Sequence, residues 1–230
     1  QRQMCIRDRY HPDKPLKTRP VHDAAAEFEG VSLNNQCYSG PNLTTPLVHI
    51  LTRFREYLAA LGSDVTAMYL QLLIPVEQRD VLRFYWLDEQ GNLIVLRMTR
   101  HIFGGVWCAA STTYAIRRAM REAGASAHIS EVLEKSMYVD DLLHSLIKLM
   151  QAAQLASSIW KLGKSKNFDF VKWNGYPREA ISEIPPECRE KGEREIETDA
   201  NTKTLGIRWD TSTDEFFYGC LLYTSPSPRD

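Results

Sequence analysis

The sequence has few cysteines and no long apolar run, and each shortage excludes a class of protein. Of five cysteines, Cys5 and Cys220 lie in the terminal segments, and no CxxC spacing occurs. The remaining three give no even count, so we expect neither a disulfide framework nor a zinc site, as in a reducing compartment. The longest apolar stretches, such as residues 93–96, fall far short of the roughly 18 apolar residues of a membrane-spanning helix. We therefore expect an intracellular protein with no membrane segment.

The two ends lack the patterns of folded or targeting sequence. The chain does not begin with methionine, and residues 1–9 (QRQMCIRDR) have neither hydrophobic periodicity nor the apolar region of a signal peptide. Residues 220–230 (CLLYTSPSPRD) are similar in kind, and both ends resemble translated sequencing-library adapter. We expect both segments to be non-native and leave them out of the fold prediction, and we expect the reading frame to continue past them.

A strong charge of either sign is also missing. Lys plus Arg number 28 and Asp plus Glu 29, which gives a net charge of −1. Without the two terminal segments, which hold four arginines and two aspartates, the counts fall from 28 to 24 and from 29 to 27, a net of −3. This balance argues against a basic face over the whole domain, so any grip on nucleic acid must be local. At 230 residues with ordinary globular composition, the chain forms one large domain or two small ones.

Hydrophobic residues recur at helical spacing in four segments. These segments are residues 46–61, 107–122, 129–135 and 147–162. Thr44 or Thr45 is a plausible cap for the first, and Gly124 and Gly163 are expected to end the second and the fourth. The apolar side of the fourth would carry Leu149, Met150, Ala153, Ala156 and Trp160.

Alternating apolar residues with turn residues between them predict hairpins and a strand. The predicted hairpins join 81–87 to 93–99, lie within 137–145, and join 204–209 to 215–218, and a strand is predicted at 168–173. Residues 10–42 suggest turns and brief strands, and 187–199 a linker or solvated helix. From residue 64 to 173 the order strand, helix, hairpin, helix, strand predicts an α+β fold. It matches a ferredoxin-like split βαβ arrangement, an antiparallel sheet with helices on one face.

Acidic residues interrupt apolar sequence at two places, Asp64 and the pair Asp140 and Asp141. A buried carboxylate is costly unless it is paired or binds a metal. The first strand and the central hairpin are neighbours in the split βαβ topology, so these carboxylates would converge, and their oxygens suit Mg²⁺. Two such ions about 4 Å apart support in-line phosphoryl transfer. The alternative is that the pair is an exposed hairpin tip and that Asp64 is a cap.

Residues 138–141 (YVDD) resemble the YxDD signature of retroelement reverse transcriptases, and residues 64–69 (DVTAMY) resemble their first aspartate motif. More specifically, the chain resembles the reverse transcriptase of BEL/Pao-type LTR retrotransposon polyproteins from about residue 10 to about 218. Further matching segments are 11–15 (HPDKP), 32–34 (SLN), 40–44 (GPNLT), 67–71 (AMYLQ), 79–84 (RDVLRF) and 97–99 (RMT).

The resemblance implies the right-hand polymerase architecture. Fingers would comprise residues 10–60 and 77–103, and the palm residues 61–76 and 104–180, with the YVDD hairpin in the second palm segment. Residues 181–219 would form a linker, a primer-grip-like hairpin and the start of the thumb.

The resemblance also implies roles for single residues. Asp64 and Asp140 would be the principal ligands of two Mg²⁺ ions, with Mn²⁺ as an alternative. The carbonyl of Val65 would be a further ligand and Asp141 a supporting one. Tyr69 would lie under the sugar of the incoming nucleotide, where its ring would clash with a 2′-hydroxyl. Alone, the ring reads equally as a core aromatic.

Other residues would bind nucleotide in the family pattern. Arg19 resembles the fingers arginine that forks onto the triphosphate, and Lys14 would assist it. Phe103 would pack beneath the nascent base pair and Gly104 would give clearance there. Lys172 falls near a lysine suspected of protonating pyrophosphate. The alternative for each of these charged residues is a solvated surface group.

Three residues would contact the primer, and two other residues depart from wider retroelement usage. Tyr138, Leu205 and Gly206 would be the primer contacts. Ala109 stands where proline is common, and Trp107 is bulkier than the residues expected there.

The function implied is RNA-directed DNA polymerase, a nucleotidyltransferase acting on dNTP with a primed RNA or DNA template. Its other partners would be the protease, ribonuclease H and integrase parts of the polyprotein, in a cytoplasmic virus-like particle. One alternative is a repurposed remnant that binds nucleic acid without catalysis, which the residues at 107 and 109 motivate. The other is a metal-dependent phosphohydrolase that uses the same carboxylates on water.

Overall fold

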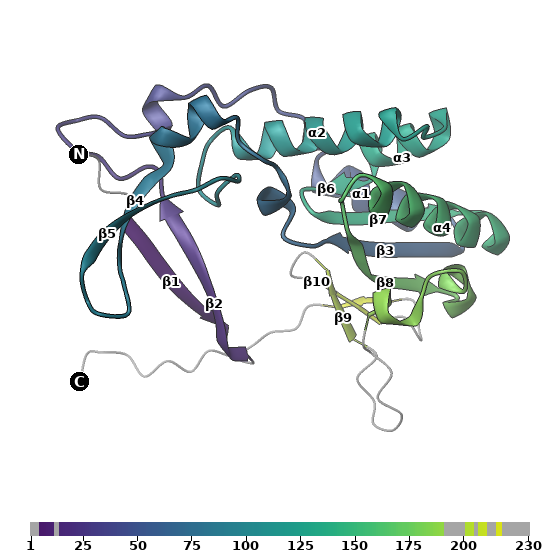
Figure 1. Ribbon diagram of the computed structural model, residues 1–230. Helices are drawn as coiled ribbons and strands as arrows, with labels where there is room; N and C mark the ends of the chain where they lie inside the picture. The colour runs from purple at the N-terminus through teal and green to yellow at the C-terminus, as the bar shows by residue number, and fades with distance from the viewer. Residues whose placement is uncertain (1–4, 12–13, 191–200, 205–206, 211–214, 218–230) are drawn as a thin grey trace, which may run out of the picture.

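The computed structural model describes residues 5–11, 14–190, 201–204, 207–210 and 215–217, with side chains for 22–190. Its largest sheet has four antiparallel strands in the order β6-β7-β3-β8 (Figure 1). Their bounds are β3 Ala59–Val65, β6 Met137–Tyr138, β7 Asp141–Leu146 and β8 Phe170–Tyr176. Strand β3, from the first half of the chain, therefore lies between β7 and β8 from the second half.

Three helices pack with this sheet to make the main core. They are α2 (Cys108–Glu122), α3 (Ala127–Lys135) and α4 (Leu149–Ser165). The core joins Ile116 and Met120 of α2, Val132 of α3 and Ile159 of α4 to Leu61 of β3. Side chains on alternate positions of a strand face opposite sides of the sheet. The neighbours of Leu61, Ala60 and Gly62, therefore face away from this core.

A separate, shorter helix covers part of the opposite side. Helix α1 (Leu47–Phe54) packs on β6 and β7, and its Ile50 and Phe54 form a small buried cluster with Ala60 and Leu143. The predicted helix over 46–61 is therefore too long, because residues 59–61 belong to β3. Pro46 is the N-cap, and no side chain caps the helix, so the predicted threonine cap is wrong.

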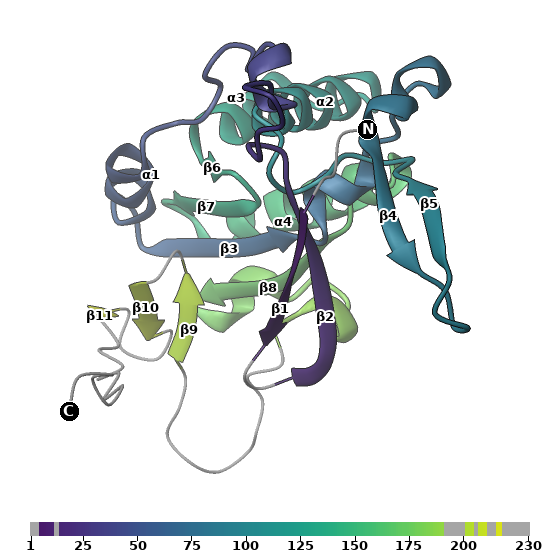
Figure 2. The same cartoon turned by 90° about the vertical axis from the view of Figure 1, so that its left-hand side faces the viewer.

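Two hairpins stand to one side of the four-stranded sheet in Figure 1, and in Figure 2, seen from that side, β1 and β2 lie in front of the sheet while β4 and β5 stand beside it. One pairs β1 (Cys5–His11) with β2 (Lys14–Asp23), and the other pairs β4 (Arg83–Leu87) with β5 (Leu93–Arg97). The second confirms a predicted hairpin. Residues 5–9, which were left out of the fold prediction, belong to β1. Backbone pairing does not depend on the side-chain pattern that is missing there.

Short 3-10 helices connect these parts. They are η1 (Asn34–Gln36), η2 (Met68–Gln71), η3 (Val76–Leu82), η4 (Arg178–Ile181) and η5 (Pro186–Cys188). A second buried cluster joins Ala24, Leu33, Ile74, Ile102 and Cys108, so β2, the segment around η1 and the start of α2 share one core.

The fourth predicted helix is confirmed, but two of its details are wrong. Helix α4 runs on to Ser165, and Gly163 is buried inside it. A Cβ on Gly163 would lie 2.6 Å from the carbonyl oxygen of Phe168 and from the Phe170 ring, so the glycine permits close packing instead of ending the helix. Leu149 and Met150 are exposed, not on the buried side, because the helix meets the sheet through its alanines and Ile159.

Three strands follow near the C-terminus, β9 (Asn201–Thr204), β10 (Ile207–Asp210) and β11 (Glu215–Phe217). Pairing of β10 with β11 confirms the predicted hairpin, whose turn lies outside the described residues. Strand β9 had no counterpart in the prediction, and most of the predicted linker falls on residues that the structure does not describe. Within the described part of the chain, no helix has the length and hydrophobicity to span a membrane.

Candidate active site

Asp64 lies near the end of β3, directly opposite Asp141 of β7 in the antiparallel register. Residues that face each other across such a pair project their side chains from the same side of the sheet. The amide of Val65 donates to the carbonyl oxygen of Asp140 at 2.8 Å, which extends the pairing to the turn. Two acidic side chains that are far apart in sequence therefore share one face, and the third adjoins them.

The turn between β6 and β7 consists of Val139 and Asp140, since Tyr138 pairs with Asp141. Val139 has φ 55°, the left-handed region that a tight two-residue hairpin turn requires. A β-branched residue seldom adopts this conformation, because its side chain crowds the backbone. Such local strain is typical of functional sites, where the surrounding structure maintains it.

Asp141 is the carboxyl group whose electrostatic environment is most disturbed. Its pKa is raised to about 7, first by burial and then by the negative charges of Asp140 and Asp64. Glu190 raises this pKa further, while Lys172 lowers it. The four carboxylates thus form one electrostatic group with an excess of negative charge.

Lys172 is the cation nearest to the first aspartate. Its ammonium donates to Oδ2 of Asp64 at 2.6 Å. Among the described residues, no three His, Cys, Asp or Glu side chains converge closely enough to hold a metal ion as they stand. The carboxylates are nevertheless hard oxygen donors, which is the chemistry that Mg²⁺ or Mn²⁺ selects.

Tyr69 lies close to this group from η2. Its pKa is raised by burial and then by the charges of Cys108 and Asp140. The ring stands edge-on to that of Phe103, with centroids 5.1 Å apart and planes at 85°. Phe103 itself is partly exposed. The two aromatic rings thus form one surface beside the acidic group.

Gly104 allows a close approach, but within the protein. Its φ is 110°, and a Cβ there would lie 2.2 Å from the carbonyl oxygen of His22 in β2. The carbonyl of Gly104 accepts from the side chain of Asn34 at 3.1 Å. Gly104 therefore allows the backbone of β2 to pass close by.

Some predicted residues have no described side chain. Lys14 and Arg19 lie in β2, whose backbone is described there, while Leu205 and Gly206 fall outside the described residues. Tyr138 is half-buried at the edge of the α1 cluster. Trp107 packs on the second core and against Gly105, and Ala109 lies exposed in α2.

Two residues of this region were missed from sequence, Asn174 and Glu190. Asn174 pairs with Gly62 and donates from Nδ2 to Glu190 at 3.1 Å. The backbone of Glu190 in turn donates to Trp173 at 2.9 Å, so the chain after η5 returns along β8. Nothing in the local pattern around residue 190 could have indicated this, because it depends on a tertiary contact.

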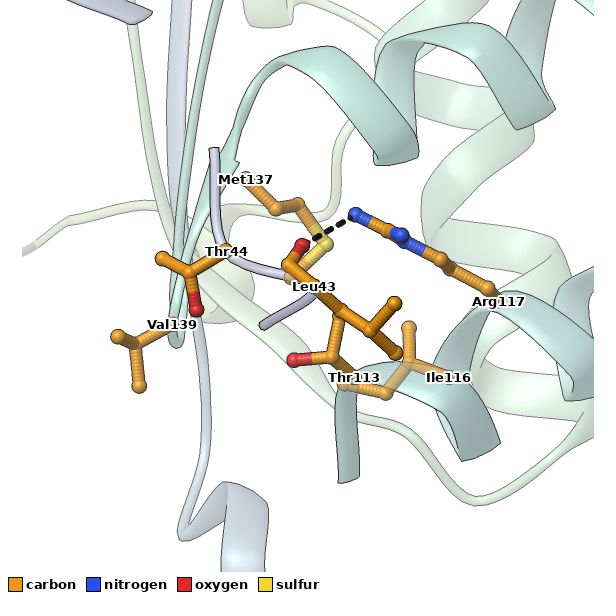
Figure 3. Close-up of a pocket in the computed structure, with 7 residues that line it drawn as sticks. All are labelled: Leu43, Thr44, Thr113, Ile116, Arg117, Met137 and Val139. Atoms are coloured by element: carbon orange, nitrogen blue, oxygen red, sulfur yellow. Dashed lines mark hydrogen bonds between the residues drawn. The ribbon is translucent and has the colours of Figure 1, made fainter. Parts of the chain in front are cut away.

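Side chains from α1 and α2 hold the base of the hairpin. The carbonyl of Glu134, at the end of α3, accepts from Thr45 at 2.8 Å and from Arg117 at 3.1 Å, and the Lys135 carbonyl accepts from Arg53 at 2.9 Å. Figure 3 shows the Arg117 guanidinium reaching the Leu43 carbonyl oxygen, 2.9 Å away. A small hollow lies here. Its lining comprises Leu43, Thr44, Thr113, Ile116, Arg117, Met137 and the turn residue Val139.

Comparison with known proteins gives structural matches only. No protein-family model matches the chain, and no curated protein matches it in sequence. Structures of a foamy virus protease-reverse transcriptase are similar to it. The complex with an RNA/DNA hybrid matches with a TM-score of 0.60, 14% identity, 94% of this chain and 23% of that one. The complex with dsDNA matches with a TM-score of 0.59, 15% identity, 94% of this chain and 36% of that one.

A third structure, of the form called dRH with dsDNA, has a TM-score of 0.57 and 15% identity over 91% of this chain and 30% of that one. At this identity the likeness establishes a shared fold, a mixed α/β fold with an antiparallel sheet as in reverse transcriptase structures. The chain spans about a third or less of the length of these foamy virus chains.

Proposed function

We propose that the chain is the reverse transcriptase segment of a BEL/Pao-type LTR retrotransposon polyprotein, an RNA-directed DNA polymerase. It would transfer a nucleotide from dNTP to a primer 3′-hydroxyl on an RNA or DNA template. The observation that carries the proposal is the register that puts Asp64 opposite Asp141, with Asp140 in the adjoining turn. This arrangement occurs on a fold shared with foamy virus reverse transcriptases.

The proposed architecture is a polymerase palm with fingers attached. The strand order β6-β7-β3-β8, with α2 and α4 packed on one side, supports a ferredoxin-like palm. The hairpins β1–β2 and β4–β5, which stand to one side of this sheet, would belong to the fingers of residues 10–60 and 77–103. Strands β10 and β11 would be the primer-grip-like hairpin.

The acidic group fits a divalent cation site by its chemistry. Asp64 and Asp140 would be the main ligands of two Mg²⁺ or Mn²⁺ ions, with the Val65 carbonyl and Asp141 supporting them. When bound, such ions activate the attacking hydroxyl and stabilise the leaving phosphate oxygen. The backbone bond from Val65 to Asp140 would keep strand and turn in register, so that the carboxylates remain on one side of the sheet.

The surrounding residues would select and orient the nucleotide. Tyr69, braced by Phe103, would sterically exclude a 2′-hydroxyl and so favour dNTP. Arg19 and Lys14 would bind the triphosphate, and Lys172 would lie near the leaving pyrophosphate.

The similar foamy virus structures contain dsDNA or an RNA/DNA hybrid, which supports nucleic acid as a binding partner of this chain. We propose a primed template in the same role here, with Tyr138, Leu205 and Gly206 contacting the primer. The rest of the polyprotein, with protease, ribonuclease H and integrase parts, would share a cytoplasmic virus-like particle with it.

The test is primer extension on a primed RNA template with dNTP and Mg²⁺. We expect Asp64→Asn and Asp140→Asn each to lower extension at least about 100-fold, because each removes charge from the cation site. Asp169→Asn is the matched control, since this aspartate is close in space but pairs with Lys164 at 3.1 Å. Extension by Asp64→Asn at the wild-type rate would refute the proposal. Template binding without extension by the wild type would favour a repurposed remnant, and phosphate release without extension a hydrolase.

A further inference from the structure

The contact between Lys172 and Asp64 depends on an irregularity in β8. Gly62 of β3 pairs with Asn174, and Asp64 pairs with Val171, so β8 has one residue more than β3 between these two pairs. This is a β-bulge, which bends a strand and redirects a side chain. Lys172 is one of the two residues inside it, and its φ is 52°. The left-handed conformation is unfavourable for a residue with a Cβ, so the surrounding structure must hold it.

The bulge places two neighbouring residues, Lys172 and Trp173, in different surroundings. Trp173 is fully buried in the main core, where its Nε1 donates to the Phe170 carbonyl at 3.0 Å. Lys172, the residue before it, instead brings its ammonium to within 2.6 Å of Asp64. The packing of Trp173 thus fixes the backbone that aims Lys172 at the carboxylate.

The two partners differ in how firmly they are held. The side chain of Asp64 is 25% exposed, whereas that of Lys172 is 59% exposed. A lysine has a long flexible stem, and an exposed one can leave a contact without unpacking the core. The carboxylate would therefore stay in place while the ammonium departs.

We propose that Lys172 is a built-in counter-cation of the acidic site, bound to Asp64 in the metal-free protein and displaced from it by the first divalent cation. This inference rests on the proposed function, in which Asp64 is a metal ligand. Lys172 offsets the repulsion among the carboxylates before a metal binds, and it competes with the metal for Oδ2 of Asp64. It is thus a positioning residue that sets the cation affinity of the site.

The test is Mn²⁺ binding to the full chain, measured by isothermal titration calorimetry without nucleotide or nucleic acid. Lys172→Met keeps the stem and removes the charge, and we expect it to bind Mn²⁺ about 5-fold more tightly, the scale of one exposed ion pair. Lys172→Arg keeps the charge, so its affinity should stay near that of the wild type. Lys164→Met, which breaks the Lys164–Asp169 ion pair, should change nothing.

Thermal melting supplies a second measurement. Without metal, Lys172→Met should melt below the wild type, and saturating Mn²⁺ should close this gap. Unchanged or weaker Mn²⁺ binding by folded Lys172→Met would overturn the inference. Asp64→Asn separates this failure from a failure of the proposed function: if Asp64→Asn binds Mn²⁺ as the wild type does, Asp64 is no ligand. If Asp64→Asn loses Mn²⁺ binding while Lys172→Met binds Mn²⁺ no more tightly than the wild type, only the counter-cation role of Lys172 is refuted.

Discussion

Asp64 of β3 and Asp141 of β7 face each other across adjacent antiparallel strands, and the pKa of Asp141 is raised by burial and then by the charges of Asp140 and Asp64. Like charges directly opposite in a sheet destabilise it. The pair of aspartates therefore makes the sheet less stable than neutral residues would, which is expected where residues serve binding and not folding.

Asp141→Asn should stabilise the metal-free protein at pH 8. The folded-state pKa of about 7 lies above the ordinary value of 3.8. Between these two pH values the folded state therefore keeps a proton on Asp141 that the unfolded state has lost. The stability of the wild type consequently falls as pH rises through about 7. The variant cannot ionise and should be more stable by on the order of 2 kcal/mol at pH 8, with a smaller gain at pH 5.

Urea unfolding in EDTA at the two pH values measures this difference. Asp169→Asn, which removes an exposed aspartate near the sheet, is the control. A variant no more stable than the wild type at pH 8 would mean that burial and negative charge do not raise the pKa of Asp141.

His144 should make the protein less stable in acid. Burial and, to a lesser extent, the charge of His128 lower its pKa to about 4 from 6.5, and Nδ1 contacts the Ser136 hydroxyl at 3.0 Å. As pH falls below 6.5, the unfolded state takes up a proton that the folded state resists until about pH 4. The histidine's share of stability is thus present above pH 6.5 and lost on acidification.

The check is the difference in unfolding free energy between wild type and His144→Asn, since Asp141 acts in the opposite direction over this range. The loss of stability from pH 7 to pH 4.5 should be smaller in the variant by on the order of 2 kcal/mol. His49→Asn alters an exposed histidine of α1 and serves as control. Equal losses in wild type and His144→Asn would contradict the prediction.

The elements with strong local periodicity were predictable from sequence. Helices α2 and α3 and the hairpin carrying Val139 follow from spacing and turn residues alone. The bulge at Lys172 was not predictable, because it arises from the packing of Trp173 against helices distant in sequence. The same reason applies to Gly163, which reads locally as a helix end but lies where α4 touches β8.

The residues of the candidate site were likewise predictable from sequence only in part. The acidic residues stand out in sequence because they interrupt apolar segments. Lys172 and Glu190 do not stand out in sequence, because a lysine in a strand and a glutamate in a charged stretch are both common. Only the register of β8 and the return of the chain beside it bring these groups to the site.

Gly62→Ala should destabilise the sheet beside the site. A Cβ on Gly62 would lie 2.2 Å from Oδ1 of Asn174, on the side of the sheet that carries Asp64. We expect a loss of about 1–3 kcal/mol, as for other overpacked positions. In an Asn174→Ala background the obstacle is gone, so the same change should cost clearly less. Thermal or urea unfolding of the four proteins measures the coupling, and additive losses would show that Asn174 is not the obstacle.

Arg117→Met should loosen the base of the hairpin. The guanidinium donates to the carbonyl oxygens of Leu43 and Glu134, and both would lose a charged donor. A loss of about 1–3 kcal/mol in unfolding free energy is expected. Arg118→Met is the matched control on the same helix, since Arg118 forms an exposed ion pair with Glu122 and its loss should change stability less than the loss of Arg117 does. Equal losses of unfolding free energy in Arg117→Met and Arg118→Met would show that Arg117 does not hold the base of the hairpin.

The most direct measurement of the central claim is Mn²⁺ binding by electron paramagnetic resonance to wild type, Asp64→Asn, Asp140→Asn and the control Asp169→Asn. If strand β3 and the hairpin form one cation site, both single variants should lose at least about 10-fold in affinity, because each removes a charged ligand. The control should bind as the wild type does. Full affinity in Asp64→Asn, with loss only in Asp140→Asn, would contradict a shared site.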